Sequence, residues 1–365
     1  MHLTVNTTTP QTIGWIVTDQ PIPPSPSALL ASLRARGVWS DTSTTGEAGL
    51  LWSTLRLVSA PFEVDLSFTV GDALPPSVRD WLPWAGRDLD EAGLTCLHRP
   101  RATYCIRSRP AWGGVPLTGP SERQPTADER AAKDNPRRAA CFTSAVSAET
   151  ALAVTGVLID ACAQRFWHGF RLSPFLGGAF DVRDYVSVHA QAGPHGLELH
   201  THGLRRFGRV DVEMGHVPHD ALPFGTRVLN EISQHQALGN VVRNGETLVV
   251  DGEYAFSLSA TSKSGSHVGN EVLALVDPSD APHRDARAPR QTLARFCEDV
   301  ADEMLTQSDL QGALRWLSHA VLLAPMLSRL LRKRAGVLAH LGREADANAD
   351  MENARALEAS AALPR

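Results

Sequence analysis

The sequence predicts an α+β protein in which antiparallel sheets and helices form two ferredoxin-like halves, followed by an all-α tail of helical-hairpin repeats. Three observations lead to this prediction. Residues 62–70 alternate between apolar and polar side chains, which is the period of a half-buried strand. Asp251-Gly252 separates two strand-like runs, as in a β-hairpin. After the segment 277–290, the chain becomes rich in Ala, Leu, Arg and Glu with helical periodicity.

The first half follows the element order β-α-β-β-α-β, which is that of a ferredoxin-like unit. Its expected elements are a strand at 13–18, a helix ending at Gly37, strands at 49–58 and 62–70, a short helix at 77–86 and a strand at 103–109. Residues 108–140 are rich in proline, glycine and mixed charge, so we expect an exposed loop there.

The second half also mixes helices with antiparallel strands. Its expected elements are a helix at 148–167 capped by Ser147, a hairpin at 197–214, a helix at 221–235, a hairpin across Asp251-Gly252 and a strand at 272–276. Residues 262–269 (SKSGSHVG) are expected to be a hairpin loop, not a phosphate-binding loop. We therefore predict one α+β domain at 1–276, then a linker at 277–293 that is rich in proline, aspartate and arginine.

The tail carries two windows of the same length, 294–327 and 328–361, in which similar residues fall at equal offsets. The expected packing positions are Ala301, Ala313, Leu317, Ala320 and Pro325 in the first window, and Ala335, Ala347, Met351, Ala354 and Ala359 in the second, where Ala359 stands in place of the usual proline. This period resembles the tetratricopeptide repeat, although two ordinary alanine-rich hairpins are the alternative. Because about three repeats are needed for a stable stack, we expect the pair to pack on the α+β domain or on a second copy.

Composition limits the classes of function. The chain has 365 residues and a net charge of −5, which does not favour nucleic acid or an anionic membrane. Five cysteines occur without a C-x-x-C pair, which favours a reducing cytoplasm over a disulfide framework. Neither a signal peptide nor a membrane-spanning run is expected.

The stretch LELHTHGLRRFGRVDVEM, residues 197–214, contains the strongest candidate site. Strand alternation places Glu198, His200 and His202 on one face, and folding at the basic turn brings Asp211 and Glu213 to the same side. Two histidines with carboxylates suit zinc or non-haem iron. The candidate metal ligands are therefore Glu198, His200, His202 and Asp211, with His98 as a further one. The alternative is a solvated polar face that binds no metal.

The same stretch resembles a signature of the uncharacterised bacterial domain of unknown function family 4261. The matching residues are Thr201, Gly203, Leu204, Phe207, Gly208, Asp211 and Glu213. The resemblance spans about residues 10–276 and implies a domain boundary but no activity. A structural role for the motif is favoured, because its two glycines bracket a turn and Phe207 is expected to enter the core.

Two functions follow as expectations. The first is a non-enzymatic cytoplasmic adaptor without a cofactor, which docks a protein or peptide through the repeat tail. Homodimerisation through that tail is a further expectation. The family resemblance suggests an immunity or accessory role in a bacterial conflict locus for such an adaptor. The second function is a metal-dependent enzyme that uses the histidines and carboxylates of the 197–214 hairpin.

Overall fold

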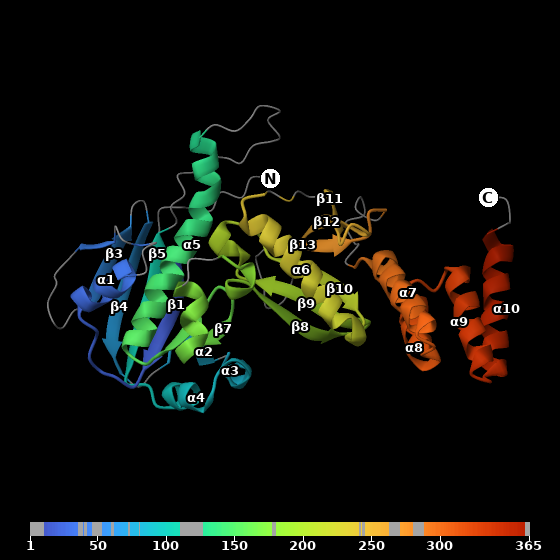
Figure 1. Ribbon diagram of the computed structural model, residues 1–365, viewed down its shortest axis with the longest axis horizontal. Coiled ribbons are helices and arrows are strands. Elements are labelled where there is room, and N and C mark those ends of the chain that lie inside the picture. Colours follow the sequence, from blue (N-terminus) through green and yellow to red (C-terminus); the bar gives the residue numbers. More distant parts are fainter. Residues whose placement is uncertain are drawn as a thin grey trace. The chain divides into compact units, whose positions relative to one another are not determined.

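The chain forms two β-sheets with helices, followed by a helical tail (Figure 1). The α+β class predicted from the sequence is confirmed. The structure is a computed structural model that describes residues 11–35, 39, 42–45, 53–59, 62–71, 74–79, 81–109, 127–176, 180–240, 242, 245–262, 271–279 and 288–361. The chain divides into two compact units, of which one contains the first sheet and the other contains most of the second sheet together with the tail.

The first sheet has seven described strands in the order β2-β3-β4-β5-β1-β6-β7. They are β1 (Gln11–Thr18), β2 (Ser43–Thr45), β3 (Thr54–Ser59), β4 (Phe62–Val70), β5 (Ala102–Arg109), β6 (Val157–Asp160) and β7 (Arg165–Trp167). Neighbouring strands pair antiparallel. The predicted alternation in β4 is present, since Phe62, Val64 and Leu66 are buried while the residues between them are partly exposed.

Helices cover both faces of this sheet. One face holds α1 (Pro26–Ala35) and the long α5 (Ala127–Ala153), which contacts β1, β4 and β6 (Figure 1). The other face holds α2 (Pro76–Arg79), α3 (Leu82–Asp88) and α4 (Glu91–His98). These three short helices bury Val78, Ala85 and Leu97, one from each helix, against Val17 and Ile159, and so form the core on that side.

The strand order within the first half differs from the expected ferredoxin-like arrangement. In a ferredoxin-like unit the first strand lies between the third and fourth strands. Here β5 lies between β4 and β1. The physical reason is that β4 and β5 pair along their length, from Glu63 opposite Arg109 to Val70 opposite Ala102, so β1 adds beyond β5.

The expected loop at 108–140 and the expected helix at 148–167 are both corrected by the structure. Residues 127–153 form α5, whereas 110–126 lie outside the described residues. The helix ends at Ala153, and Thr155 then leaves the helical conformation with a φ of 49°. Gly156 lies close to β1, since a Cβ there would lie 2.9 Å from Ile16 Cγ2. The apolar run then continues as the buried strand β6. Its composition fits a helix or a buried strand equally well.

The second sheet has six described strands in the order β11-β12-β13-β10-β9-β8. They are β8 (Ser187–Gly193), β9 (Gly196–His202), β10 (Val212–Val217), β11 (Thr247–Val250), β12 (Tyr254–Ser262) and β13 (Glu271–Val276). Two runs of three consecutive strands meet where β10 and β13 pair in parallel, which is also not a ferredoxin-like order. The expected loop at 262–269 lies almost wholly outside the described residues.

Helix α6 (Leu222–Ala237) packs on one face of the second sheet. A Cβ at Gly225 would lie 2.6 Å from Leu199 Cδ1 and 3.5 Å from Met214 Sδ, so the helix backbone approaches β9 and β10 closely. This face of β9 therefore carries the leucines. Because side chains alternate along a strand, the opposite face carries the polar residues of β9.

The tail consists of α7 (Arg290–Thr306), α8 (Leu310–Leu323), α9 (Ser328–His340) and α10 (Glu344–Ala361), which pack as successive pairs (Figure 1). It packs on the second-sheet unit, which is one of the two expected arrangements. Phe296 of α7 stacks on Phe224 of α6 with ring centroids 3.8 Å apart. Asp277, just after β13, accepts hydrogen bonds from the backbone N–H groups of Gln291 and Thr292, both at 2.8 Å.

Seven of the ten predicted packing positions in the tail are buried. The buried positions are Ala301, Ala313, Leu317, Ala320, Ala335, Ala347 and Ala354. Pro325 and Ala359 are exposed, and Met351 is partly exposed. Small side chains thus lie where the helices approach each other.

Two findings concern the expectations drawn from cysteine content and hydropathy. All five cysteines are free thiols. Within the part of the chain that the structure describes, no helix combines the length and the apolar character needed to cross a membrane.

Candidate metal centre

Strand β9 presents two histidines on the face opposite α6. Leu197 and Leu199 are buried, and the residues between and after them, Glu198, His200 and His202, have the other parity. The predicted hairpin forms, because β9 pairs antiparallel with β10. Glu213 lies directly opposite His200, and Met214 lies opposite Leu199.

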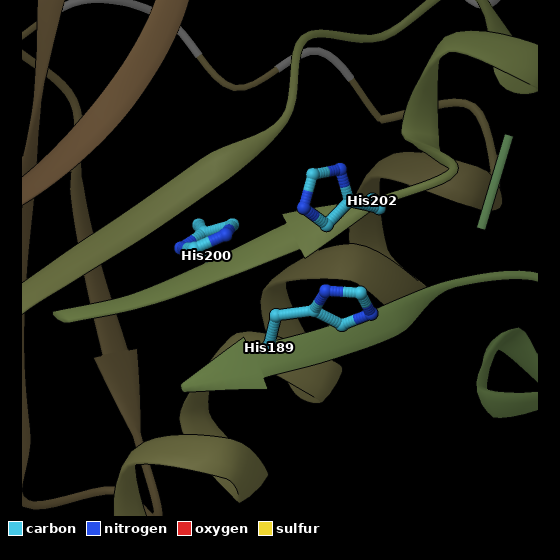
Figure 2. Close-up of side chains that lie close together, drawn as sticks. All are labelled: His189, His200 and His202. Carbon is cyan, nitrogen blue, oxygen red and sulfur yellow. The ribbon is translucent and has the colours of Figure 1, made fainter. Parts of the chain in front are cut away.

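A third histidine joins this pair from the neighbouring strand. His189 of β8 lies beside β9, and the three rings gather in one place (Figure 2). One ring nitrogen from each of His189, His200 and His202 lies within 4.8 Å of the other two. The ring centroids of His189 and His200 are 6.0 Å apart. His189 and His202 are buried, at 8% and 6% exposed, and His200 is partly exposed.

This geometry suits a divalent transition metal. Zinc binds imidazole nitrogen at about 2.0–2.1 Å, so tetrahedral ligand nitrogens lie roughly 3.4 Å apart. The three nitrogens, already within 4.8 Å of one another, reach that spacing by small rotations of the side chains. Three histidines around one ion leave a fourth position for water or substrate, which is the pattern of catalytic zinc sites.

Only some of the predicted metal ligands lie in this cluster. His200 and His202 belong to the cluster, whereas Glu198, Asp211 and His98 do not. The Glu198 side chain lies at Gly193, where a Cβ would be 2.9 Å from its Cγ. His98 is an exposed residue at the end of α4.

Asp211 serves the turn between β9 and β10. It accepts hydrogen bonds from Thr201 Oγ1 and the Leu204 backbone N–H, both at 3.2 Å. Thr201 has the parity opposite to the two histidines, so Asp211 is directed away from the cluster. Burial raises the pKa of Asp211 to about 6, although the Leu204 N–H, Arg205 and Thr201 each act to lower it.

Four further motif residues, Gly203, Leu204, Phe207 and Gly208, form this turn. Leu204–Phe207 form a short 3₁₀ helix in which Leu204 and Phe207 are buried. Gly203 has a φ of 123°, and a Cβ there would lie 2.4 Å from the Tyr185 carbonyl oxygen. Gly208 adopts the left-handed conformation with a φ of 65°. Both glycines are therefore required by the backbone path.

His189 was not among the sequence-based candidates. A usable signal was present in the run Gly193-Pro194-His195-Gly196, which has the composition of a tight turn. Counting back from a two-residue turn at Pro194 and His195 pairs His189 with His200. The histidine is found only if the preceding segment is recognised as a strand.

Comparison with protein-family models, with curated proteins and with solved structures found no match to this chain. The resemblance of residues 201–213 to the domain of unknown function family 4261 and that of the tail to tetratricopeptide repeats therefore remain predictions.

Proposed function

We propose that this chain is a zinc-dependent protein whose β8–β9 strand pair binds one zinc ion through His189, His200 and His202. The observation that supports the proposal is the convergence of three imidazole nitrogens within 4.8 Å of one another. Imidazole is the commonest protein ligand for zinc among neutral side chains. Of the two functions expected from the sequence, three ligands with an open fourth position favour the metal-dependent enzyme. The open position can hold a reactive water molecule.

Zinc content tests this proposal directly. Protein purified without chelator and dialysed after exposure to zinc should hold about one zinc ion per chain by mass spectrometry. His200→Gln and His202→Gln should lose that ion, because each removes one of three ligands. His98→Gln is the matched control, since His98 is exposed at the end of α4. Absence of zinc from the wild-type protein would refute the site.

A second function, docking of a protein or peptide through the tail, is supported by two adjoining cavities. They have volumes of about 320 and 460 Å³ and lie among α8, α9 and α10. Both are lined by Arg334 and Asp350, whose ion pair has two N–O distances of 2.7 Å. The larger cavity is also lined by Val321, Leu331 and Leu357, which supply apolar surface for a partner side chain.

A point substitution tests docking better than deletion of the tail, because deletion would uncover the aromatic contacts of α7. Asn353→Trp should fill the larger cavity, which Asn353 lines. Ala345→Trp on the exposed side of α10 is the control. A partner, or a second copy of the chain in sedimentation, should be lost with the first variant and kept with the second. Equal binding by both variants would remove the cavity as the docking site.

A further inference from the structure

A row of three polar, titratable side chains crosses three neighbouring strands of the second sheet. Glu213 of β10 lies directly opposite His200 of β9, and His189 follows on β8. Directly opposed residues have Cβ atoms about 4.5–5.5 Å apart and share a face. Glu213 is only 6% exposed, so its carboxylate is buried next to the proposed zinc ligands.

Resting on the proposed zinc site, we propose that Glu213 is a positioning residue for His200. In the zinc-bound protein its carboxylate accepts a hydrogen bond from the ring N–H of His200 that does not face the metal. An imidazole that binds metal through one nitrogen carries its proton on the other, and that proton needs an acceptor when it is buried. The hydrogen bond fixes the ring orientation and tautomer and increases the basicity of the ligand.

The neighbouring carboxylates are less suited to this role. Asp211 is bonded to Thr201 and Leu204 in the turn. Glu198 lies on β9 itself, with its side chain at Gly193. Glu213 is not a fourth ligand in this arrangement, because it lies outside the group whose ligand atoms are within 4.8 Å of one another. Because Glu213 lies opposite His200, its carboxylate is placed to contact the His200 ring and not the zinc ion itself.

The test is zinc affinity measured by competition with a chelating dye. Glu213→Gln should weaken zinc binding by about 10–100-fold, which is the usual cost of losing such a partner. Glu213→Asp keeps the charge and should recover part of the loss. Glu231→Gln, an exposed site on α6, is the charge-matched control and should bind as the wild type does.

A second measurement separates positioning from general damage. Long-range proton–nitrogen NMR of the His200 ring should show one tautomer in zinc-bound wild type and a changed pattern in Glu213→Gln. Thermal unfolding of the zinc-free variants shows whether they fold, and Glu213→Asp serves if Glu213→Gln does not. Unchanged affinity and tautomer in Glu213→Gln would overturn the role of Glu213 and leave the zinc site standing. A wild-type protein that binds no zinc would overturn both.

Discussion

At the scale of single residues, Asp211 is a carboxylate held where its charge is unfavourable. Its side chain is 7% exposed, and burial is the largest influence on its pKa. The hydrogen bonds from Thr201 and Leu204 make the turn between β9 and β10 depend on this one side chain. An asparagine has a carbonyl oxygen that can accept the same bonds without the charge.

We therefore expect Asp211→Asn to change how stability depends on pH. The pKa of Asp211 is raised to about 6 in the folded protein, above the unfolded value of about 3.9. Between about pH 4 and 6, Asp211 is therefore protonated in the folded protein and ionised in the unfolded chain. Protonation of Asp211 stabilises the fold fully below about pH 4, and this contribution is lost as pH rises through about 6. Relative to wild type, the variant should gain roughly 2–3 kcal/mol of unfolding free energy between pH 4 and 7. Urea unfolding of both proteins at pH 4 and pH 7 measures this change. The same free-energy difference between variant and wild type at both pH values would contradict the prediction.

At the scale of elements, an aromatic group joins the tail to the second-sheet unit. Phe296 of α7 contacts Phe224 of α6, Tyr254 of β12 and Trp316 of α8. Polar contacts support the same joint, since Tyr254 donates to Asp299 at 3.1 Å and His319 lies 2.9 Å from Asp220. The tail is thus attached by side chains from both of its first two helices.

Phe296→Ala should destabilise the protein by roughly 2–4 kcal/mol, because the substitution removes a ring that four elements share. Chemical denaturation followed by tryptophan fluorescence measures the change, since Trp316 lies at the joint. Gln311→Ala on an exposed position of α8 is the control and should cost less than about 0.5 kcal/mol. A similar loss in both variants would mean that Phe296 does not hold the tail.

At the scale of the whole molecule, zinc should act as a stabilising ligand of the folded chain. The ligands come from β8 and β9, which are neighbours only in the folded sheet. An ion that binds the folded state stabilises it by about 2.7 kcal/mol when its free concentration is 100 times Kd. The ligands must be neutral imidazoles, so protons compete with the metal.

Addition of zinc to chelator-treated protein at pH 7.5 should therefore raise Tm by roughly 5–10 °C. The increase should disappear at pH 5, where protonation of histidine opposes binding. Differential scanning calorimetry measures both values. His202→Gln is the control, and an equal increase in that variant would place the stabilising ion elsewhere.

Local patterns in the sequence predicted the strands that alternate clearly or flank Asp251-Gly252, because alternation and tight turns depend on neighbouring residues. The strands β2, β7 and β8 were not predicted. The segment 148–167 was misassigned because its apolar run fits a helix or a buried strand, and its pairing with β1, with Leu158 opposite Ile16, is not visible in the local sequence. His200 and His202 were found from strand parity. His189 could not be placed without the β8–β9 register. The predicted parity holds for Glu213, which lies opposite His200, but Asp211 precedes β10 and is bonded to Thr201 and Leu204 instead.

The parallel pairing of β10 with β13 has a consequence for the order in which the sheet assembles. Strands β8, β9 and β10 follow one another closely, whereas Val212 pairs with Leu273 of a segment made much later. Contacts distant in sequence form slowly, so we expect pulse-labelled hydrogen exchange to show protection of β8 and β9 before β13. Simultaneous protection would contradict this order. The three histidines lie on the early side of it, so the proposed zinc site would form in the nascent chain while the sheet is still open.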